Sequence, residues 1–169
     1  MDMRYDRTQG KSAKERLQQV RFPELFACFQ TYTDFSDKYC TWIAEELLVA
    51  VKKSALSTTR DLSIRAEQLG INDKKLAVIF QAIRITVNNE LGELELFLQK
   101  FPGYLRTGGR CAIMTYHSIE DRMVKIAFKE LVASGRGDLV NKKVLTADRK
   151  EVKKNKAARS AKFRVFELY

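Results

Sequence analysis

Apolar residues recur at three- to four-residue spacing along the first hundred residues, which predicts a series of amphipathic helices. Ser12 and Glu15 have the spacing of a capping box at the start of the first helix. Pro23 suits the first turn of the next helix. Ser36 is expected to cap a longer helix, whose apolar face consists of Tyr39, Trp42, Ile43, Leu47 and Val51.

A shorter helix over residues 59–69, ended by Gly70, completes a small all-helical module of residues 12–70. After it, a single long helix is expected from Asn72 to about residue 100. Its apolar positions are Leu76, Ile79, Ile83, Val87, Leu91, Leu94 and Leu98.

The pattern changes after Pro102 and Gly103, which end the long helix. Residues 110–116 form a short apolar run that is typical of a strand. Ser118 is expected to cap the following helix, residues 119–133. The inward face of that helix is expected to consist of Ile119, Met123, Ile126, Ala127 and Leu131.

A second strand is expected over residues 161–169, with Phe163 and Val165 on one side, after Gly135 and Gly137 have broken the helix. The order helix, strand, helix, strand predicts an α/β sheet unit. Two strands alone leave unpaired edges. Further strands are therefore expected in another chain or another segment.

The charge is concentrated near this last strand. The chain has 31 Lys and Arg against 21 Asp and Glu, a net charge of +10. Residues 142–164, called the basic segment below, hold ten basic and two acidic residues, a net charge of +8. Such a segment is either a solvated, mobile stretch or a contact surface for phosphates. Phe163 is its only aromatic residue, so base stacking is not indicated there.

Cysteine and histidine are too few and too scattered for a metal site. Cys28, Cys40 and Cys111 have no C-x-x-C spacing, and His117 is the only histidine. Reduced thiols in a reducing compartment are expected, with no metal and no disulfide. No apolar run reaches the length of a membrane span, so no membrane association is expected.

Six blocks of sequence carry a resemblance to one family. They are Asp2-Met-Arg-Tyr-Asp6, Gln9-Gly-x-Ser12, the helical stretch from Phe80 to Glu95, Gly108-Gly-Arg110, His117-Ser-Ile-Glu-Asp-Arg122, and the stretch from Asn155 to Arg164. In this order they resemble the small-subunit rRNA cytosine-N4 methyltransferases of bacteria and organelles. The resemblance covers essentially the whole chain, but only the C-terminal part of the family's domain.

The resemblance implies a doubly wound α/β methyltransferase sheet that binds S-adenosylmethionine, with an inserted all-helical module that helps to hold the rRNA. Residues 1–11 would be a connector from the methyltransferase core and residues 12–72 the insert. Residues 73–169 would be the C-terminal part of the methyltransferase domain, with a basic linker at 142–160. By this resemblance, the cofactor-binding N-terminal strands are expected to be absent from this chain. We therefore expect the main cofactor-binding residues to lie outside it, and the isolated chain not to bind the cofactor.

Methylation of cytosine N4 requires an acceptor beside the exocyclic amine of a base that has left its stack. The candidate catalytic residues are Asp2, Asp6 and His117, the last at the carboxyl end of a strand, where open α/β sheets bind ligands. The alternative roles are ion pairs of the two aspartates with Arg4 or Arg7, and ordering of the strand-to-helix turn by His117.

RNA contacts are expected from Arg84, Asn88, Lys153, Lys154, Lys156, Arg159, Lys162 and Arg164. Arg84 and Asn88 lie one helical turn apart, and hydrogen bonding between helix and strand is the alternative role for this pair. Structural roles at the cleft, such as capping and ion pairing, are expected for Glu90, Ser118, Asp121 and Arg122.

The first functional hypothesis is methyl transfer from S-adenosylmethionine to cytosine N4 of small-subunit rRNA, as part of a larger enzyme. Its partners would be the rRNA or the ribosomal subunit, and a second chain that completes the sheet. The second hypothesis is a catalytically inactive RNA-binding or ribosome-assembly protein derived from that family, and the third is a helical interaction module. A bacterial cytoplasm or a mitochondrial matrix is expected. A truncation, a split gene or a decayed paralogue would each explain why the resemblance begins inside a motif.

Overall fold

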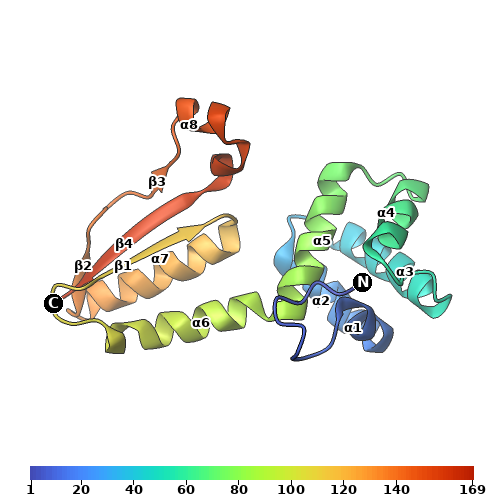
Figure 1. The fold of residues 1–169 in the computed structure, drawn as a ribbon, viewed down its shortest axis with the longest axis horizontal. Helices are drawn as coiled ribbons and strands as arrows, with labels where there is room; N and C mark the ends of the chain where they lie inside the picture. The colour runs from blue at the N-terminus through green and yellow to red at the C-terminus, as the bar shows by residue number, and fades with distance from the viewer. The chain divides into compact units, whose positions relative to one another are not determined.

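The computed structural model describes residues 1–169, which divide into a unit of helices alone and a unit of helices and strands (Figure 1). The helical unit is Met1–Glu90 and the sheet unit is Leu91–Tyr169. No helix is both long enough and apolar enough to cross a membrane.

Five helices form the helical unit: α1 (Ala13–Gln19), α2 (Phe22–Tyr32), α3 (Asp37–Lys52), α4 (Thr59–Gln68) and α5 (Asp73–Asn88). The predicted helix starts are confirmed. Ser12 and Glu15 form a reciprocal capping box on α1, Pro23 lies in the first turn of α2, and the Ser36 side chain accepts a hydrogen bond at the start of α3. Gly70 has a φ of +68° after α4, the conformation that glycine adopts most readily.

The core of the helical unit includes α5. Its largest fully buried side chains are Phe29, Ile43, Leu47, Leu62 and Ile79, which come from α2, α3, α4 and α5. On α3, Tyr39, Trp42 and Val51 are only half-buried, whereas Cys40 and Ala44 are fully buried. The structural unit thus extends to Glu90, and the insert boundary at residue 72 stays a prediction about the family.

The prediction of one long helix from residue 72 to 100 is wrong. Asn89 adopts the left-handed conformation, with φ 51° and ψ 38°, and separates α5 from α6 (Glu90–Lys100). Asparagine tolerates this conformation better than most residues other than glycine. The Asn88 side chain also donates to the Arg84 carbonyl oxygen over 2.9 Å, within the last turn of α5.

Four strands form the sheet of the second unit: β1 (Arg110–Thr115), β2 (Gly137–Leu139), β3 (Leu145–Thr146) and β4 (Lys162–Leu168). Each of β1, β2 and β3 pairs antiparallel with β4, in the order β1-β4-β2, and β3 lies off this path. The fold class is confirmed as mixed α/β, with β1 and β4 where the sequence predicts strands. The doubly wound parallel arrangement stays a prediction.

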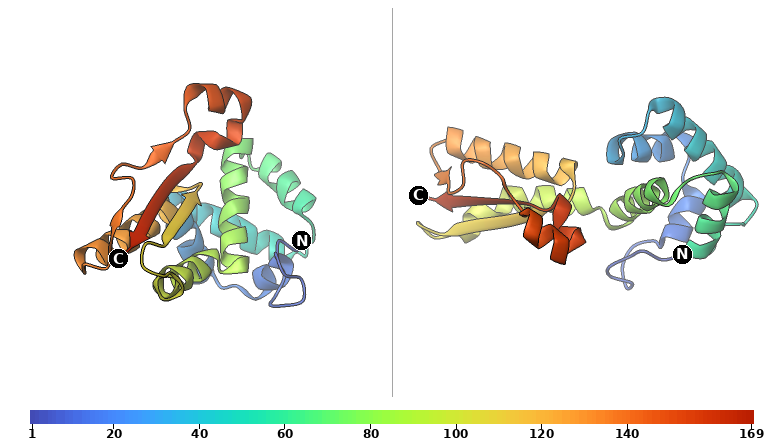
Figure 2. Two further views of the ribbon diagram at one scale, coloured as in Figure 1. Left: turned by 60° about the vertical axis from the view of Figure 1, so that its left-hand side comes forward. Right: turned by 90° about the horizontal axis from the view of Figure 1, so that it is seen from above.

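One face of this sheet is covered by α7 (Ser118–Ala133), as Figure 2 shows. The core there includes Phe101, Val124, Phe128 and Phe166, whose aromatic rings lie 5.5–6.1 Å apart between centroids. Of the predicted inward face of α7, Met123, Ala127 and Leu131 pack against this core, whereas Ile126 is exposed. The prediction left out Val124 and Phe128, which are fully buried. Gly137 in β2 packs so closely on Phe166 and the Glu167 carbonyl oxygen that a Cβ atom would have no room.

The predicted basic linker at residues 142–160 contains short regular elements. They are β3, the short helix α8 (Arg149–Lys154) and the 3-10 helix η2 (Lys156–Ser160). Asp148 caps α8 and Asn155 caps η2, each through its side-chain oxygen. A second 3-10 helix, η1 (Phe101–Tyr104), follows α6 at the predicted Pro-Gly break.

Candidate functional site

The N-terminal loop, residues 1–11, holds the first candidate carboxylate in an ion pair. Asp2 accepts from Arg4 Nε over 2.8 Å and from Arg4 Nη2 over 2.9 Å. The same guanidinium donates to the carbonyl oxygens of Gln9 and Gly10 over 3.3 and 3.0 Å. The hydrogen bonds from Arg4 lower the pKa of Asp2 to about 2. The predicted ion pair between Asp2 and Arg4 is confirmed.

Asp6 is held differently and keeps one oxygen available. Its Oδ1 accepts from the Thr8 backbone N–H over 2.9 Å and from the Thr8 hydroxyl over 2.6 Å. These bonds lower the pKa of Asp6 below its ordinary value. The side chain is exposed, and Oδ2 has no hydrogen-bond partner within the chain. Asp6 is therefore better placed than Asp2 to accept a hydrogen bond from a bound molecule.

Asn88 fixes the backbone between these two carboxylates. Its Oδ1 accepts from the Tyr5 backbone N–H over 2.8 Å, although the two residues are 83 positions apart. Its Nδ2 donates to the Met3 carbonyl oxygen, also over 2.8 Å. Met3 has a φ of +84°, a region that residues other than glycine rarely adopt, so these bonds hold a strained conformation.

Glu90 completes this contact at the start of α6. It accepts from Arg84 Nε over 2.7 Å and Arg84 Nη2 over 3.1 Å, and from the Tyr5 hydroxyl over 3.1 Å. Arg84, Asn88 and Glu90 thus come together against the N-terminal loop. Arg84 and Asn88 form hydrogen bonds within the protein, but with Glu90 and the N-terminal loop and not with the strand that the alternative role predicted.

His117 orders the turn from β1 into α7. Its Nδ1 accepts from the Glu120 backbone N–H over 3.4 Å, which makes His117 the cap of α7 in place of Ser118. Because Nδ1 is an acceptor, the neutral ring carries its proton on Nε2, which lies 3.0 Å from Glu120 Oε1. Burial raises the pKa of Glu120, but the contacts with His117 and the Tyr116 backbone N–H outweigh it and lower that pKa overall. The structural alternative for His117 is confirmed.

Asp121 pairs with two of the residues that the sequence assigns to RNA. It accepts from Arg164 Nε over 2.8 Å, from Arg164 Nη2 over 3.2 Å and from Lys162 Nζ over 3.3 Å. Asp121 is 8% exposed and the Arg164 side chain 14% exposed. Arg164 therefore joins α7 to β4 and is not presented to solvent for a phosphate. Ser118 and Arg122, on the same helix, are exposed.

The remaining basic candidates lie on the surface. Lys153, Lys154, Lys156 and Arg159 are exposed and have no acidic partner within 4.0 Å. Lys153, Lys156 and Arg159 line one surface hollow together with Val152. The folding of α8 and η2 thus gathers separate positive charges into one patch.

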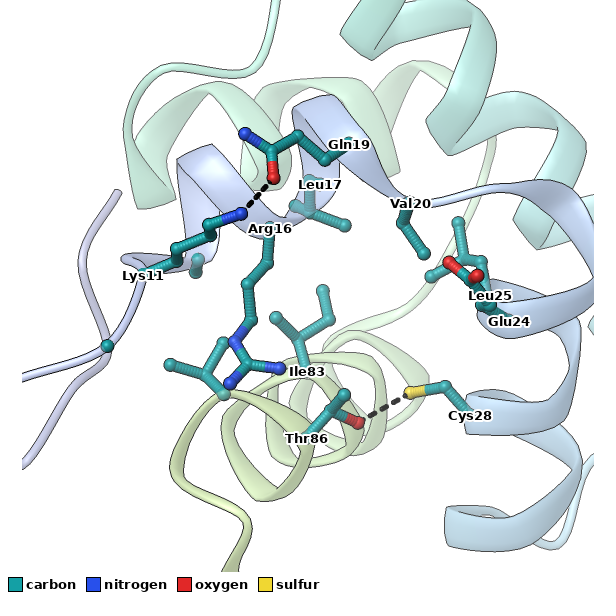
Figure 3. Close-up of a pocket in the computed structure, with 13 residues that line it drawn as sticks. Lys11, Arg16, Leu17, Gln19, Val20, Glu24, Leu25, Cys28, Ile83 and Thr86 are labelled. Carbon is teal, nitrogen blue, oxygen red and sulfur yellow. Dashed lines mark hydrogen bonds between the residues drawn. The ribbon is translucent and has the colours of Figure 1, made fainter.

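A cavity of about 680 Å³ lies between α1, α2 and α5 of the helical unit (Figure 3). Its walls are mainly apolar, and Arg16 extends from α1 across it toward α5. At one wall, Cys28 Sγ lies 3.1 Å from the Thr86 hydroxyl oxygen, and burial raises the pKa of the Cys28 thiol. None of the candidate catalytic residues lines this cavity. All three cysteines are buried and unbonded to one another.

Residues 1–169 match the model of the MraW methylase family. The chain belongs to this family. Curated relatives named ribosomal RNA small subunit methyltransferase H include proteins from Elusimicrobium minutum, at 38% identity over 169 residues, and Nautilia profundicola, at 35% over 185 residues. Another, from Chlamydia trachomatis, is 35% identical over 173 residues. Each alignment covers 99% of this chain but only 57–59% of the relative, so the chain spans just under three fifths of their length.

Membership of the MraW methylase family implies the use of S-adenosylmethionine. The glycines of this chain do not fit the expected cofactor loop, in which a glycine-rich turn follows a strand and opens a helix. Gly135 follows a helix, and Gly137 packs directly against the Phe166 ring and the Glu167 carbonyl oxygen, which leaves no room for a ligand there. No three His, Cys, Asp or Glu side chains gather as a metal-ligand set.

Tyr5 belongs to the contact between the N-terminal loop and the pair Asn88 and Glu90, and the sequence alone assigned it no role. Tyr5 stands inside the Asp2–Asp6 motif and bonds to Asn88 and Glu90, which stand inside the Phe80–Glu95 motif. The signal in the sequence that could have indicated this contact is that both partners belong to motifs of the same resemblance.

Proposed function

We propose that this chain takes part in methyl transfer from S-adenosylmethionine to N4 of a cytosine in small-subunit rRNA. The match of the whole chain to the MraW methylase family carries this proposal, together with the names of its relatives. The site that best supports it is the N-terminal loop, where Asp6 presents an ionised carboxylate oxygen beside an aromatic side chain.

Asp6 would accept a hydrogen bond from the exocyclic amine of the cytosine. When bound, S-adenosylmethionine supplies the methyl group. As the amine nitrogen forms its bond to carbon, it gains positive charge, which a nearby carboxylate stabilises. A carboxyl group with a lowered pKa is a poor proton acceptor, so Asp6 orients the amine and stabilises charge, and water takes the proton.

Two surfaces of the sheet unit would serve partners. The exposed basic residues of α8 and η2 would contact rRNA phosphates, whose neutralisation releases counterions. The outer edge of β1 is unpaired, and Met114 of this strand is exposed. A further protein segment, from the same or a second chain, would complete the sheet there. The reduced cysteines fit a bacterial cytoplasm or a mitochondrial matrix.

Replacing Asp6 by asparagine is expected to lower kcat for methyl transfer roughly tenfold, because an amide cannot stabilise positive charge as a carboxylate does. The KM for S-adenosylmethionine should stay unchanged. The measurement is transfer of labelled methyl groups to unmethylated small subunits by the protein as its gene encodes it. Asp34→Asn, which neutralises another exposed carboxylate of the helical unit, is the control. Equal rates for the two variants would contradict the role of Asp6.

A further inference from the structure

Tyr5 is a large aromatic residue that the fold holds rigidly in solvent. It is 71% exposed. Its backbone N–H donates to Asn88 Oδ1 over 2.8 Å and its hydroxyl donates to Glu90 Oε1 over 3.1 Å. Both ends of the residue are therefore fixed before anything binds.

Ordering a side chain costs conformational entropy, and for Tyr5 this cost is met on folding. A pre-organised aromatic side chain binds a planar group without a further loss of rotamer freedom. The bond to Asn88 fixes the Tyr5 backbone, and the bond from the hydroxyl to Glu90 restricts the side-chain torsions that orient the ring. The ring is thus a prepared surface for stacking.

The neighbours of Tyr5 indicate which planar group fits. Asp6 follows it directly and has an available carboxylate oxygen, which accepts from an exocyclic amine. Arg7 is exposed in the same loop and forms no ion pair, so it can contact a phosphate. A stacking surface, an acceptor and a cation in three consecutive residues match the base, the amine and the backbone of a single-stranded nucleotide.

We propose that Tyr5 stacks on an unstacked RNA base that carries an exocyclic amine, cytosine or adenine, and that Asp6 accepts from this amine. This proposal rests on the proposed function, since it names the residue that would hold the substrate base. It assigns to Tyr5 a contact made by the ring, whereas Asn88 and Glu90 are positioning residues that hold the ring in place.

The test is binding of a fluorescent single-stranded oligocytidylate to the 169-residue chain, measured by anisotropy at several salt concentrations. Tyr5→Ala is expected to weaken binding at least about fivefold, as loss of one base-aromatic stack does. The salt slope should stay unchanged, because no phosphate contact is removed. Tyr5→Phe keeps the ring and should bind within about twofold of the original chain.

Tyr104→Ala is the matched control, because Tyr104 is 84% exposed and lies in the sheet unit. A second probe of the same length, with abasic sites in place of every base, separates stacking from a disturbed loop. The original chain and Tyr5→Ala should bind the abasic probe equally. If Tyr5→Ala weakens both probes equally, or behaves like Tyr104→Ala, the stacking proposal is wrong.

The outcomes also distinguish the stacking role of Tyr5 from the proposed function on which it rests. If the chain binds neither probe, both the RNA-directed function and the stacking role of Tyr5 are overturned. If the chain binds oligocytidylate with a steep salt slope and Tyr5→Ala leaves the affinity unchanged, only the stacking role of Tyr5 is wrong.

Discussion

Replacing Asp121 by alanine is expected to lower the free energy of unfolding of the sheet unit by about 3–5 kcal/mol. The change leaves the guanidinium of Arg164 and the ammonium of Lys162 without their carboxylate. Arg164 is 14% exposed, so water replaces that partner poorly. Hydrogen exchange of the β4 backbone amides measures this loss, because β4 lies at the centre of the sheet.

Arg122→Ala is the control for this prediction, since Arg122 is exposed on the same helix and should change stability by no more than about 0.5 kcal/mol.

The dependence of the free energy of unfolding on acidic pH provides a second test. Burial raises the pKa of Asp121, but Arg164 and Lys162 lower it by more, to below 3.8. The stabilisation from this pair should therefore be complete above about pH 5 and be lost as the pH falls through the lowered pKa. A loss below 1 kcal/mol in Asp121→Ala would show that the cluster is not structural.

Replacing Lys153, Lys154 and Lys156 together by glutamine is expected to weaken binding of single-stranded RNA by up to about 100-fold near 0.1 M salt. The slope of log affinity against log salt should become shallower by about 2, because each lysine on a phosphate releases counterions. Anisotropy titrations at four or more salt concentrations measure both quantities.

A control with the same change in net charge replaces Lys52, Lys53 and Lys129, which are exposed elsewhere. If the two triple variants lose the same affinity, general charge and not the patch on α8 and η2 is responsible. If neither the affinity nor its salt slope moves in the first variant, phosphate contact by this patch is ruled out.

Local signals in the sequence were sufficient for much of the fold. Ser12, Pro23, Ser36 and Gly70 mark helix ends through bonds and torsions within a few residues, and each behaves as its pattern predicts. The two longest strands follow from apolar runs. The break at Asn89 was missed because the apolar spacing continues through it, and only the contacts of the preceding Asn88 with a distant loop show why the helix ends.

Errors elsewhere arose where a partner far along the chain decides the outcome. The buried face of α7 is the one that meets Phe166 of β4, so Val124 and Phe128 lie inside although Ile126 fits the helical spacing equally well. In the sequence, Arg164 is one more cation of the basic segment. In the structure it forms an ion pair with Asp121, 43 residues earlier. Charge along a sequence does not distinguish a paired cation from a solvated one.

The proposed function is tested most directly by the N4-methylcytidine content of small-subunit rRNA, measured by mass spectrometry of digested nucleosides. Cells in which the gene encoding this chain is deleted are compared with the parent strain and with deleted cells that carry the restored gene. Methyl transfer to cytosine N4 predicts that the modified nucleoside disappears on deletion and returns with the gene. An unchanged amount in the deleted cells would contradict it and would favour an RNA-binding role without catalysis.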